Sequence, residues 1–158
     1  MTLCSEDWVY VPADGKVPVT VRLPALEEIV LQWPRISEMI GRATVRQGCF
    51  EPIDYLQLAM AGRVGIWVCE VDHRIDAVMI TEVRTYPRRR VLEVVACGGD
   101  RMTRWHRAAS EALNRHGREN GCSHISATGR PGWARVTGSE FVGDVAMTRP
   151  IPQDDDHG

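Results

Sequence analysis

The sequence predicts a single α/β domain built around a mixed sheet. Its 158 residues, 44% hydrophobic and 25% charged, suffice for one ordinary folded core. The apolar pattern predicts two helices, three strands, a helix, a strand, a short helix and a final strand, in that order. The strand at 90–96 is apolar throughout its interior except for Glu93, as expected of a strand covered on both faces by helices.

Composition sets the domain boundaries and limits the function classes. We expect an N-terminal arm or edge strand at 1–16, the folded domain at 17–150 and an acidic, disordered tail at 151–158. The net charge of −2 gives no overall attraction to polyanions. The sequence offers no candidate membrane span, so we expect no membrane partner.

Two helices are expected in the first part of the domain. Apolar residues recur at helical spacing from Leu23 to Ile40, and Pro34 inside this run predicts a kink or two short helices. A further short helix is expected at 52–61, ending at Gly62. Its buried side is predicted to carry Ile53, Leu56 and Met60.

A hairpin and a third strand follow. Residues 64–71 and 76–85 read as antiparallel strands joined by a turn at 72–74, and Pro87 prevents the second strand from continuing. The third strand, at 90–96, leads through Gly98 and Gly99 into a helix.

The helix after the two glycines is strongly amphipathic, and Gly121 ends it. Its predicted buried stripe is Met102, Trp105, Ala109, Ala112, Leu113 and His116. Strands at 124–128 and 140–149 complete the sheet, with the segment GRPGWARV at 129–136 giving a loop and short helix between them. Trp67 and Trp105 are expected in the core, whereas Trp133 could form a pocket wall or contact a partner.

The predicted order of helices and strands resembles the GNAT acyltransferase fold. In more detail, the motifs RVGIWV, TYPRRRVLEVV, CGGDRM and GRPGWARV, in this order, resemble small GNAT-like proteins of tailed bacteriophages. The resemblance implies a phage-encoded, acetyl-CoA-dependent N-acyltransferase whose loop at 97–102 departs from the family's pyrophosphate-loop spacing. It implies these cofactor-binding residues: Val94, Val95, Ala96, Gly98, Gly99, Arg101 and Arg104.

The turn after the third strand has two interpretations. Backbone amides at a helix start bind phosphate, and Gly98 and Gly99 permit the backbone to approach one. Asp100, however, is a good N-cap residue, and its carboxylate would occupy the same amides. The turn is therefore either a pyrophosphate site helped by Arg101 and Arg104 or a plain capped corner.

Acyl transfer to an amine needs a base, and the resemblance places carboxylates on the central strands. Glu82 and Glu93 are the candidate catalytic residues, although either could instead form an ion pair with Arg84 or with an arginine of the run 88–90. No tyrosine stands in the family's usual acid position, because Tyr10, Tyr55 and Tyr86 all precede the strand at 90–96.

Other chemistries have weaker support. Five cysteines without a CxxC pair predict reduced thiols, and no metal site is expected. The arginines of the middle third could bind an acyl-CoA phosphate, nucleic acid or another phage protein, with nucleic acid not favoured. The rival function is a non-catalytic, virion-associated structural or binding component, so the expected location is the host cytoplasm or the phage virion.

Overall fold

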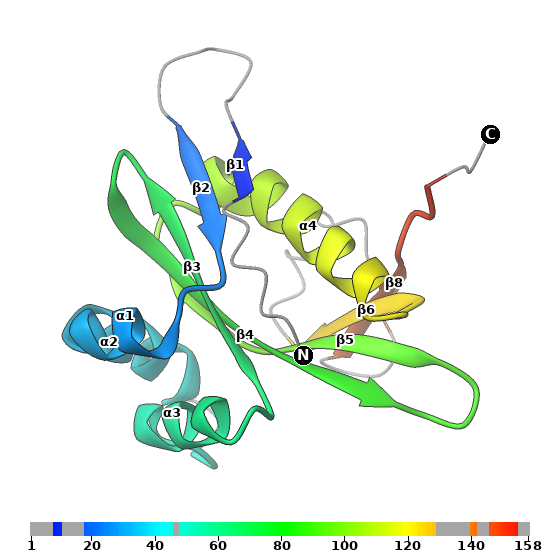
Figure 1. The fold of residues 1–158 in the computed structure, drawn as a ribbon, viewed down its shortest axis with the longest axis horizontal. Helices are drawn as coiled ribbons and strands as arrows, with labels where there is room; N and C mark the ends of the chain where they lie inside the picture. The colour runs from blue at the N-terminus through cyan, green and yellow to red at the C-terminus, as the bar shows by residue number, and fades with distance from the viewer. Residues whose placement is uncertain (1–7, 11–17, 46–47, 129–139, 142–145, 155–158) are drawn as a thin grey trace.

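A computed structural model describes residues 8–10, 18–45, 48–128, 140–141 and 146–154, and the statements below concern these residues. They form a single eight-stranded sheet in the order β1-β2-β3-β4-β5-β6-β8-β7 (Figure 1). The strands are β1 (Trp8–Tyr10), β2 (Val19–Arg22), β3 (Gly65–Val71), β4 (Arg74–Thr85), β5 (Arg90–Gly99), β6 (His124–Thr128), β7 (Glu140–Phe141) and β8 (Ala146–Pro150). The helices are α1 (Leu26–Leu31), α2 (Trp33–Thr44), α3 (Pro52–Met60) and α4 (Met102–Glu119).

The sheet is mixed because β5 and β6 run parallel, whereas the other neighbouring strands are antiparallel. The connection between the two parallel strands is α4, as a parallel pair requires a crossover. The predicted α/β mixed sheet is thus confirmed.

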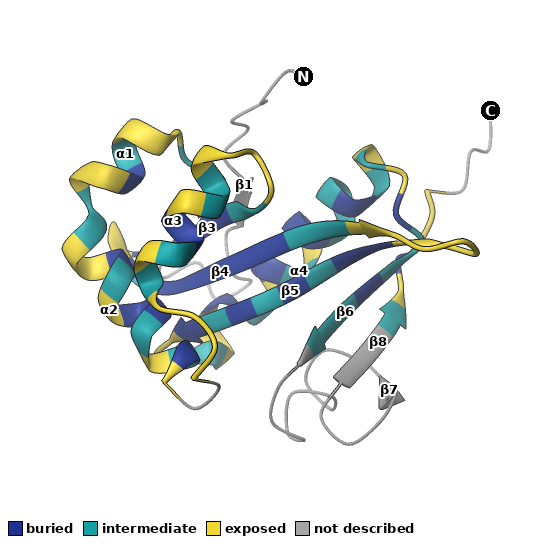
Figure 2. Cartoon of the chain, turned by 90° about the horizontal axis from the view of Figure 1, so that it is seen from below, coloured by how far each residue is buried: buried dark blue, intermediate teal, exposed yellow. Residues whose placement is uncertain are grey.

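Helices cover both faces of the sheet (Figures 1 and 2). On one face, α4 packs through Trp105, Ala109 and Leu113 against β2, β3, β4 and β5. On the other face, α1, α2 and α3 pack against the opposite side of the central strands, with Ile36 and Met39 fully buried. Burial on both faces explains why β4 and β5 read as nearly continuous apolar runs.

Several sequence predictions are confirmed by this arrangement. The helix pattern of 23–40 is divided into α1 and α2 at Gln32, with Pro34 in the first turn of α2, where its missing donor costs nothing. The β3–β4 hairpin turns through Asp72 and His73, both with positive φ, and Gly121 with φ of 72° follows α4. Trp67 and Trp105 are buried in the core.

Other predictions were wrong or fall outside the described residues. The sequence pattern missed β2, and the buried side of α3 is Tyr55 and Leu56, whereas Ile53 is 45% and Met60 66% exposed. The segment GRPGWARV, with Trp133, lies outside the described residues. Part of the predicted N-terminal arm forms β1, an edge strand paired with β2.

Among the described helices, none is both long and apolar enough to cross a membrane.

Candidate functional site

The two parallel strands β5 and β6 pair over only part of their length. Their ladder runs from Val91 opposite His124 to Val94 opposite Ala127, and no described strand pairs with β5 on that side from there to Gly99. Figure 2 shows β6 turning away from β5 at this end. We call this opening the β5–β6 notch. Along it, the backbone groups of β5 that face away from β4 pair with no strand in the described part of the chain.

An irregularity in β5 marks the point where the notch begins. Against β4, Thr81 pairs with Val94 and Ile80 pairs with Ala96, so Val95 is an extra residue. Such a bulge changes the direction in which neighbouring side chains point. Val95 and Ala96 both pack on the face of α1 to α3, whereas Val94 and Cys97 face α4.

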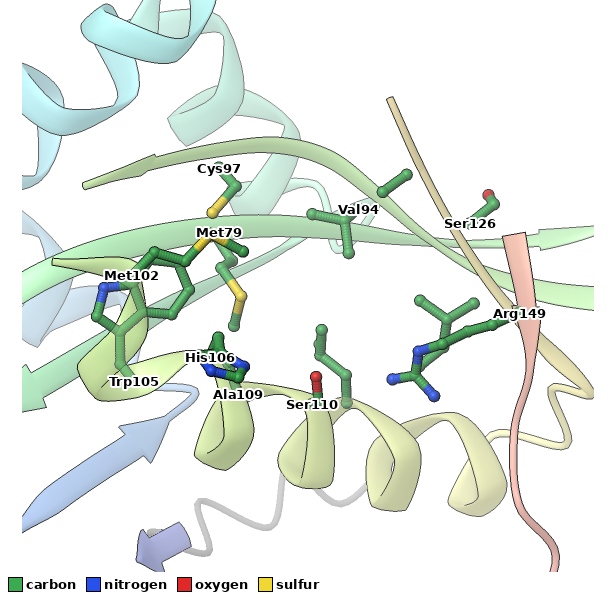
Figure 3. A pocket seen from close by; sticks show the side chains of 13 residues that line it. Met79, Val94, Cys97, Met102, Trp105, His106, Ala109, Ser110, Ser126 and Arg149 are labelled. Carbon is green, nitrogen blue, oxygen red and sulfur yellow. The ribbon is translucent and has the colours of Figure 1, made fainter. Parts of the chain in front are cut away.

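A cavity of about 70 Å³ lies on the α4 side of the notch, and we call it the α4-side cavity. Its walls are mostly apolar, with Met79, Val94 and Cys97 from β4 and β5 (Figure 3). The polar groups in its lining are His106 and Ser110 of α4, Ser126 of β6 and Arg149 of β8.

A second cavity, of about 240 Å³, lies on the opposite face of the same strands, and we call it the α3-side cavity. Its aromatic wall is Phe50 and Tyr55, whose rings stack with centroids 5.1 Å apart. Its charged lining is Glu82, Arg84 and Glu93. Val94 lines both cavities, so the two approach each other where the notch begins.

The two predicted catalytic carboxylates lie directly opposite each other, Glu82 on β4 and Glu93 on β5. Arg84 is their shared counter-ion: its Nε lies 2.7 Å from Glu93 Oε2 and its Nη2 lies 3.3 Å from Glu82 Oε2. A hydrogen bond with Tyr86, together with the two carboxylates, raises the pKa of Arg84. The ion pairing considered in the sequence analysis is therefore present.

Glu93 is the more enclosed of the two carboxylates, with 23% of its side chain exposed against 28% for Glu82. Its Oε2 is buried, and the Arg84 Nε that lies 2.7 Å away forms an ion pair with it without hydrogen-bond geometry. Glu93 is therefore the candidate that is better shielded from solvent for accepting a proton.

Sequence reasoning did not select Tyr55, because it precedes the helix at 102–119. The fold nevertheless puts its side chain in the wall of the cavity that contains Glu93. Burial, followed by the nearby Cys49 and Asp54, raises the pKa of the Tyr55 phenol. The hydroxyl therefore stays protonated at neutral pH and can donate.

The two glycines expected to form a turn are instead the last residues of β5, paired with Val78 and Ala77. The prediction that the strand ends at Ala96 was wrong. A side chain on Gly98 would overlap the carbonyl oxygen of Met39 in α2, and one on Gly99 would overlap the backbone of β4. Close packing of α2 and β4 on this strand is a structural reason for both glycines.

The prediction that Asp100 caps the helix was also wrong. Its carboxylate lies 3.0 Å from Arg42 Nη1 of α2, and its carbonyl accepts a hydrogen bond of 2.8 Å from Trp105 Nε1. The N-cap is Arg101, in the left-handed conformation with φ of 56° and ψ of 49°, and it makes no capping hydrogen bond through its side chain. The first amides of α4 are therefore not capped by a side chain, and Arg101 and Arg104 are exposed beside them.

Arg149 is a site residue that sequence reasoning missed. Its Nη1 donates a hydrogen bond of 2.7 Å to Asn114 Oδ1 of α4, and burial lowers the pKa of its guanidinium. A signal was present, because the two-residue period of a strand puts Arg149 on the same side as the buried Ile151. An arginine on the apolar side of a strand is unusual, and this position therefore marks Arg149 as a candidate site residue.

Three of the four described thiols are poor candidates for nucleophiles. Burial raises the pKa of Cys97 to about 12 and also raises the pKa of Cys69 and Cys122, so these thiols stay protonated. Across the described ranges, no group of three His, Cys, Asp or Glu side chains is arranged to hold a metal ion.

Comparison with known proteins identifies the fold. No family model matches the chain, and no curated protein matches it significantly. Solved structures do match. The GNAT domain of S. lividans PAT has a TM-score of 0.63 at 13% identity, covering 92% of this chain and 97% of that one.

Two further structures agree. A GNAT-family acetyltransferase from Listeria monocytogenes has a TM-score of 0.55 at 12% identity, covering 85% and 95% of the two chains. A predicted acetyltransferase with acetyl-CoA from Clostridium acetobutylicum has a TM-score of 0.58 at 11% identity, covering 78% and 91%. The chain thus has the fold of GNAT acetyltransferases, as the predicted order of helices and strands indicated.

Proposed function

We propose that this chain is an N-acyltransferase that takes its acyl group from an acyl-CoA, with acetyl-CoA as the simplest donor. The observation that carries the proposal is the β5–β6 notch, which opens at the Val95 bulge and has a cavity on each face of the sheet. A linear donor can reach the notch from one face and an acceptor from the other. The acetyl-CoA bound by the Clostridium structure of the same fold supports this choice of donor.

The residues at the notch fit an acyl-CoA. The free edge of β5 at Val95 and Ala96 offers backbone hydrogen bonds to the amide groups of a pantetheine arm, and Val94 faces the cavity. The uncapped start of α4, flanked by Arg101 and Arg104, offers donors and positive charge to the pyrophosphate. Gly98 and Gly99 lie on β5 between the notch and the start of α4, and they contribute only their backbone.

The α3-side cavity supplies the acceptor side of the reaction. An amine nitrogen attacks the thioester carbonyl, so that a C–N bond forms and the C–S bond breaks. Glu93 accepts the proton that the amine loses, directly or through water, and the Tyr55 hydroxyl is the candidate to protonate the departing thiolate. Glu82 adds negative charge that attracts a cationic amine.

Thermal denaturation with millimolar acetyl-CoA tests the proposal. Binding to the folded state raises the melting temperature, by an amount equivalent to about 2.7 kcal/mol at a hundredfold excess over Kd. Arg104→Gln and Arg101→Gln should reduce the shift. The matched control is Arg107→Gln, on the exposed side of the same helix. No shift for the wild-type chain would contradict the proposal.

A second candidate function is a non-catalytic structural or binding component of a phage particle. The observation that favours it is the ion pairing of Glu82 and Glu93 with Arg84, because a structural role is sufficient to explain these carboxylates. Phage origin and a location in the host cytoplasm or the virion remain part of this proposal. Co-purification with capsid or tail proteins, without a response to acetyl-CoA, would favour this function; salt-sensitive retention on DNA would point to nucleic acid.

A further inference from the structure

A half-buried cation, Arg149, lies in the α4-side cavity. The side chain of Arg149 extends from β8 into the cavity toward α4, as Figure 3 shows. The position is set by the sheet, because Arg149 pairs with Ile125 of β6 in the antiparallel β6–β8 ladder. Both strands lie at the base of the β5–β6 notch.

Nothing in the described part of the chain neutralises this charge. The hydrogen-bond partner of Arg149 is the neutral side-chain amide of Asn114, and no carboxylate of the described residues forms an ion pair with it. The surrounding walls are apolar, with Leu113 and Ile125 among them. Burying a charge is costly unless an opposite charge and hydrogen bonds compensate for it. An anion bound in the cavity would supply both.

The cavity leads from this charge to the notch. Val94, where β5 and β6 separate, lines the same space as Arg149, and the hydroxyl of Ser110 points into it (Figure 3). Its volume of about 70 Å³ is several times the roughly 10–15 Å³ that one water molecule needs on the same scale. A short chain of a few atoms fits between the two places.

We propose that the α4-side cavity selects an acyl donor whose acyl group ends in a carboxylate, with Arg149 as the residue that binds this carboxylate. The guanidinium can form a charge-assisted, two-pronged contact with a carboxylate, which a neutral acetyl group cannot provide. Ser110 supplies a further donor. This inference rests on the proposed acyl-CoA function and names its donor class as a short dicarboxylic acyl group.

Calorimetric titration of the full chain tests it with four probes: succinyl-CoA, acetyl-CoA, CoA and free succinate. We expect succinyl-CoA to bind at least about tenfold more tightly than acetyl-CoA, because the charge-assisted hydrogen bond of its carboxylate has no counterpart in a neutral acetyl group. Arg149→Gln should bring the two affinities together. Arg107→Gln, the same change on the exposed side of α4, should preserve the difference.

The outcomes separate the two proposals. Equal wild-type affinities for succinyl-CoA and acetyl-CoA would overturn the carboxylate inference and leave the proposed function standing. If Arg149→Gln lost as much affinity for CoA itself as for succinyl-CoA, the carboxylate inference would also be overturned. Arg149 would then contact the CoA part of the donor and not its acyl group. Binding of succinate with no binding of any CoA probe would overturn both. The wild-type preference does not depend on whether the variant folds, and the melting temperature of Arg149→Gln reports its folding.

Discussion

The two faces of the β5–β6 notch have opposite electrostatic character although they share β4, β5 and the residue Val94. The α4-side cavity has apolar walls and one cation, Arg149. The α3-side cavity has an aromatic wall and two carboxylates around one arginine. Alternation along the strands produces this difference, and the bulge at Val95 shifts the alternation at the point where the sheet opens.

This difference shows how one sheet can bind two ligands of opposite charge on separate faces. An anionic donor is attracted to the face that carries Arg149 and the arginines at the start of α4. A cationic amine is attracted to the face that carries Glu82 and Glu93. Each ligand then reaches the notch from its own face. The following changes test this division of roles.

The largest effect is expected for Glu93→Gln. Removing the proposed base should lower kcat/KM by about 100-fold or more, in the range of general-base contributions. The rate is followed as free thiol released from acetyl-CoA, with 2-phenylethylamine as an acceptor suited to the aromatic and acidic cavity. Glu111→Gln, an exposed change on α4, serves as the control. A Glu93→Gln variant with more than half of the wild-type rate would remove Glu93 from the mechanism.

A loss of stability should follow from Gly98→Ala, because the new methyl group would overlap the backbone of Met39. Overpacking of this kind costs roughly 1–3 kcal/mol of unfolding free energy. Gly41→Ala is the matched control: its methyl group would meet Pro52 Cγ at an ordinary 3.8 Å, inside α2. It should be neutral or stabilising by up to about 1 kcal/mol. Equal stability of the two variants in urea denaturation would show that β5 and α2 are not packed this closely.

Stability should also fall as the pH drops below about 6.5. Burial lowers the pKa of His116, which packs edge-on against Trp67 at 5.0 Å. As the pH falls, the unfolded chain therefore binds a proton at a higher pH than the folded chain does. The stability that is present above the unfolded pKa is lost as the pH falls toward the lower folded pKa. The slope from this residue is at most about 1.4 kcal/mol per pH unit.

The control for the pH effect is His116→Gln. His106 and His124 also have lowered pKa values, from burial first and then from Arg107 and Arg89, so the variant should keep a smaller slope of the same sign. Unfolding free energies at about pH 7.5 and pH 5.5 give the comparison. An unchanged slope of unfolding free energy against pH in the variant would mean that burial does not lower the pKa of His116.

The smallest effect is expected for Arg84→Gln. It leaves Glu82 directly opposite Glu93 without their counter-ion, and like charges across a strand pair cost about 0.2–1 kcal/mol. Adding Glu82→Gln to this variant should restore most of the loss, measured by urea denaturation at low salt. A double variant no more stable than Arg84→Gln alone would show that the two carboxylates do not repel.

Local patterns predicted much of the fold. The β3–β4 hairpin follows from two apolar runs around a three-residue turn, and the break between α1 and α2 follows from Pro34. The strand β2 was missed because its four residues stand immediately before a helical pattern, and too few residues remain to show alternation.

Contacts between distant parts of the chain explain the errors at the site. Glycines usually mark turns, but Gly98 is small because α2, some sixty residues earlier in the chain, lies against it. Asp100 has the residue type of an N-cap, but its carboxylate is bound by Arg42 from the same distant helix. Neither partner is visible in the local sequence. The outcome for Glu82 and Glu93 differs, because Arg84 is nearby on the same strand and the pairing was foreseen.

The most direct test of the account is the set of amide groups that respond to an acyl-CoA. In amide NMR spectra of the full chain, saturating acetyl-CoA should shift the signals of Val95 to Cys97 in β5 and of Met102 and Thr103 at the start of α4. Binding that leaves these amides unchanged, or shifts only groups far from the β5–β6 notch, would contradict the proposal that the notch holds the donor.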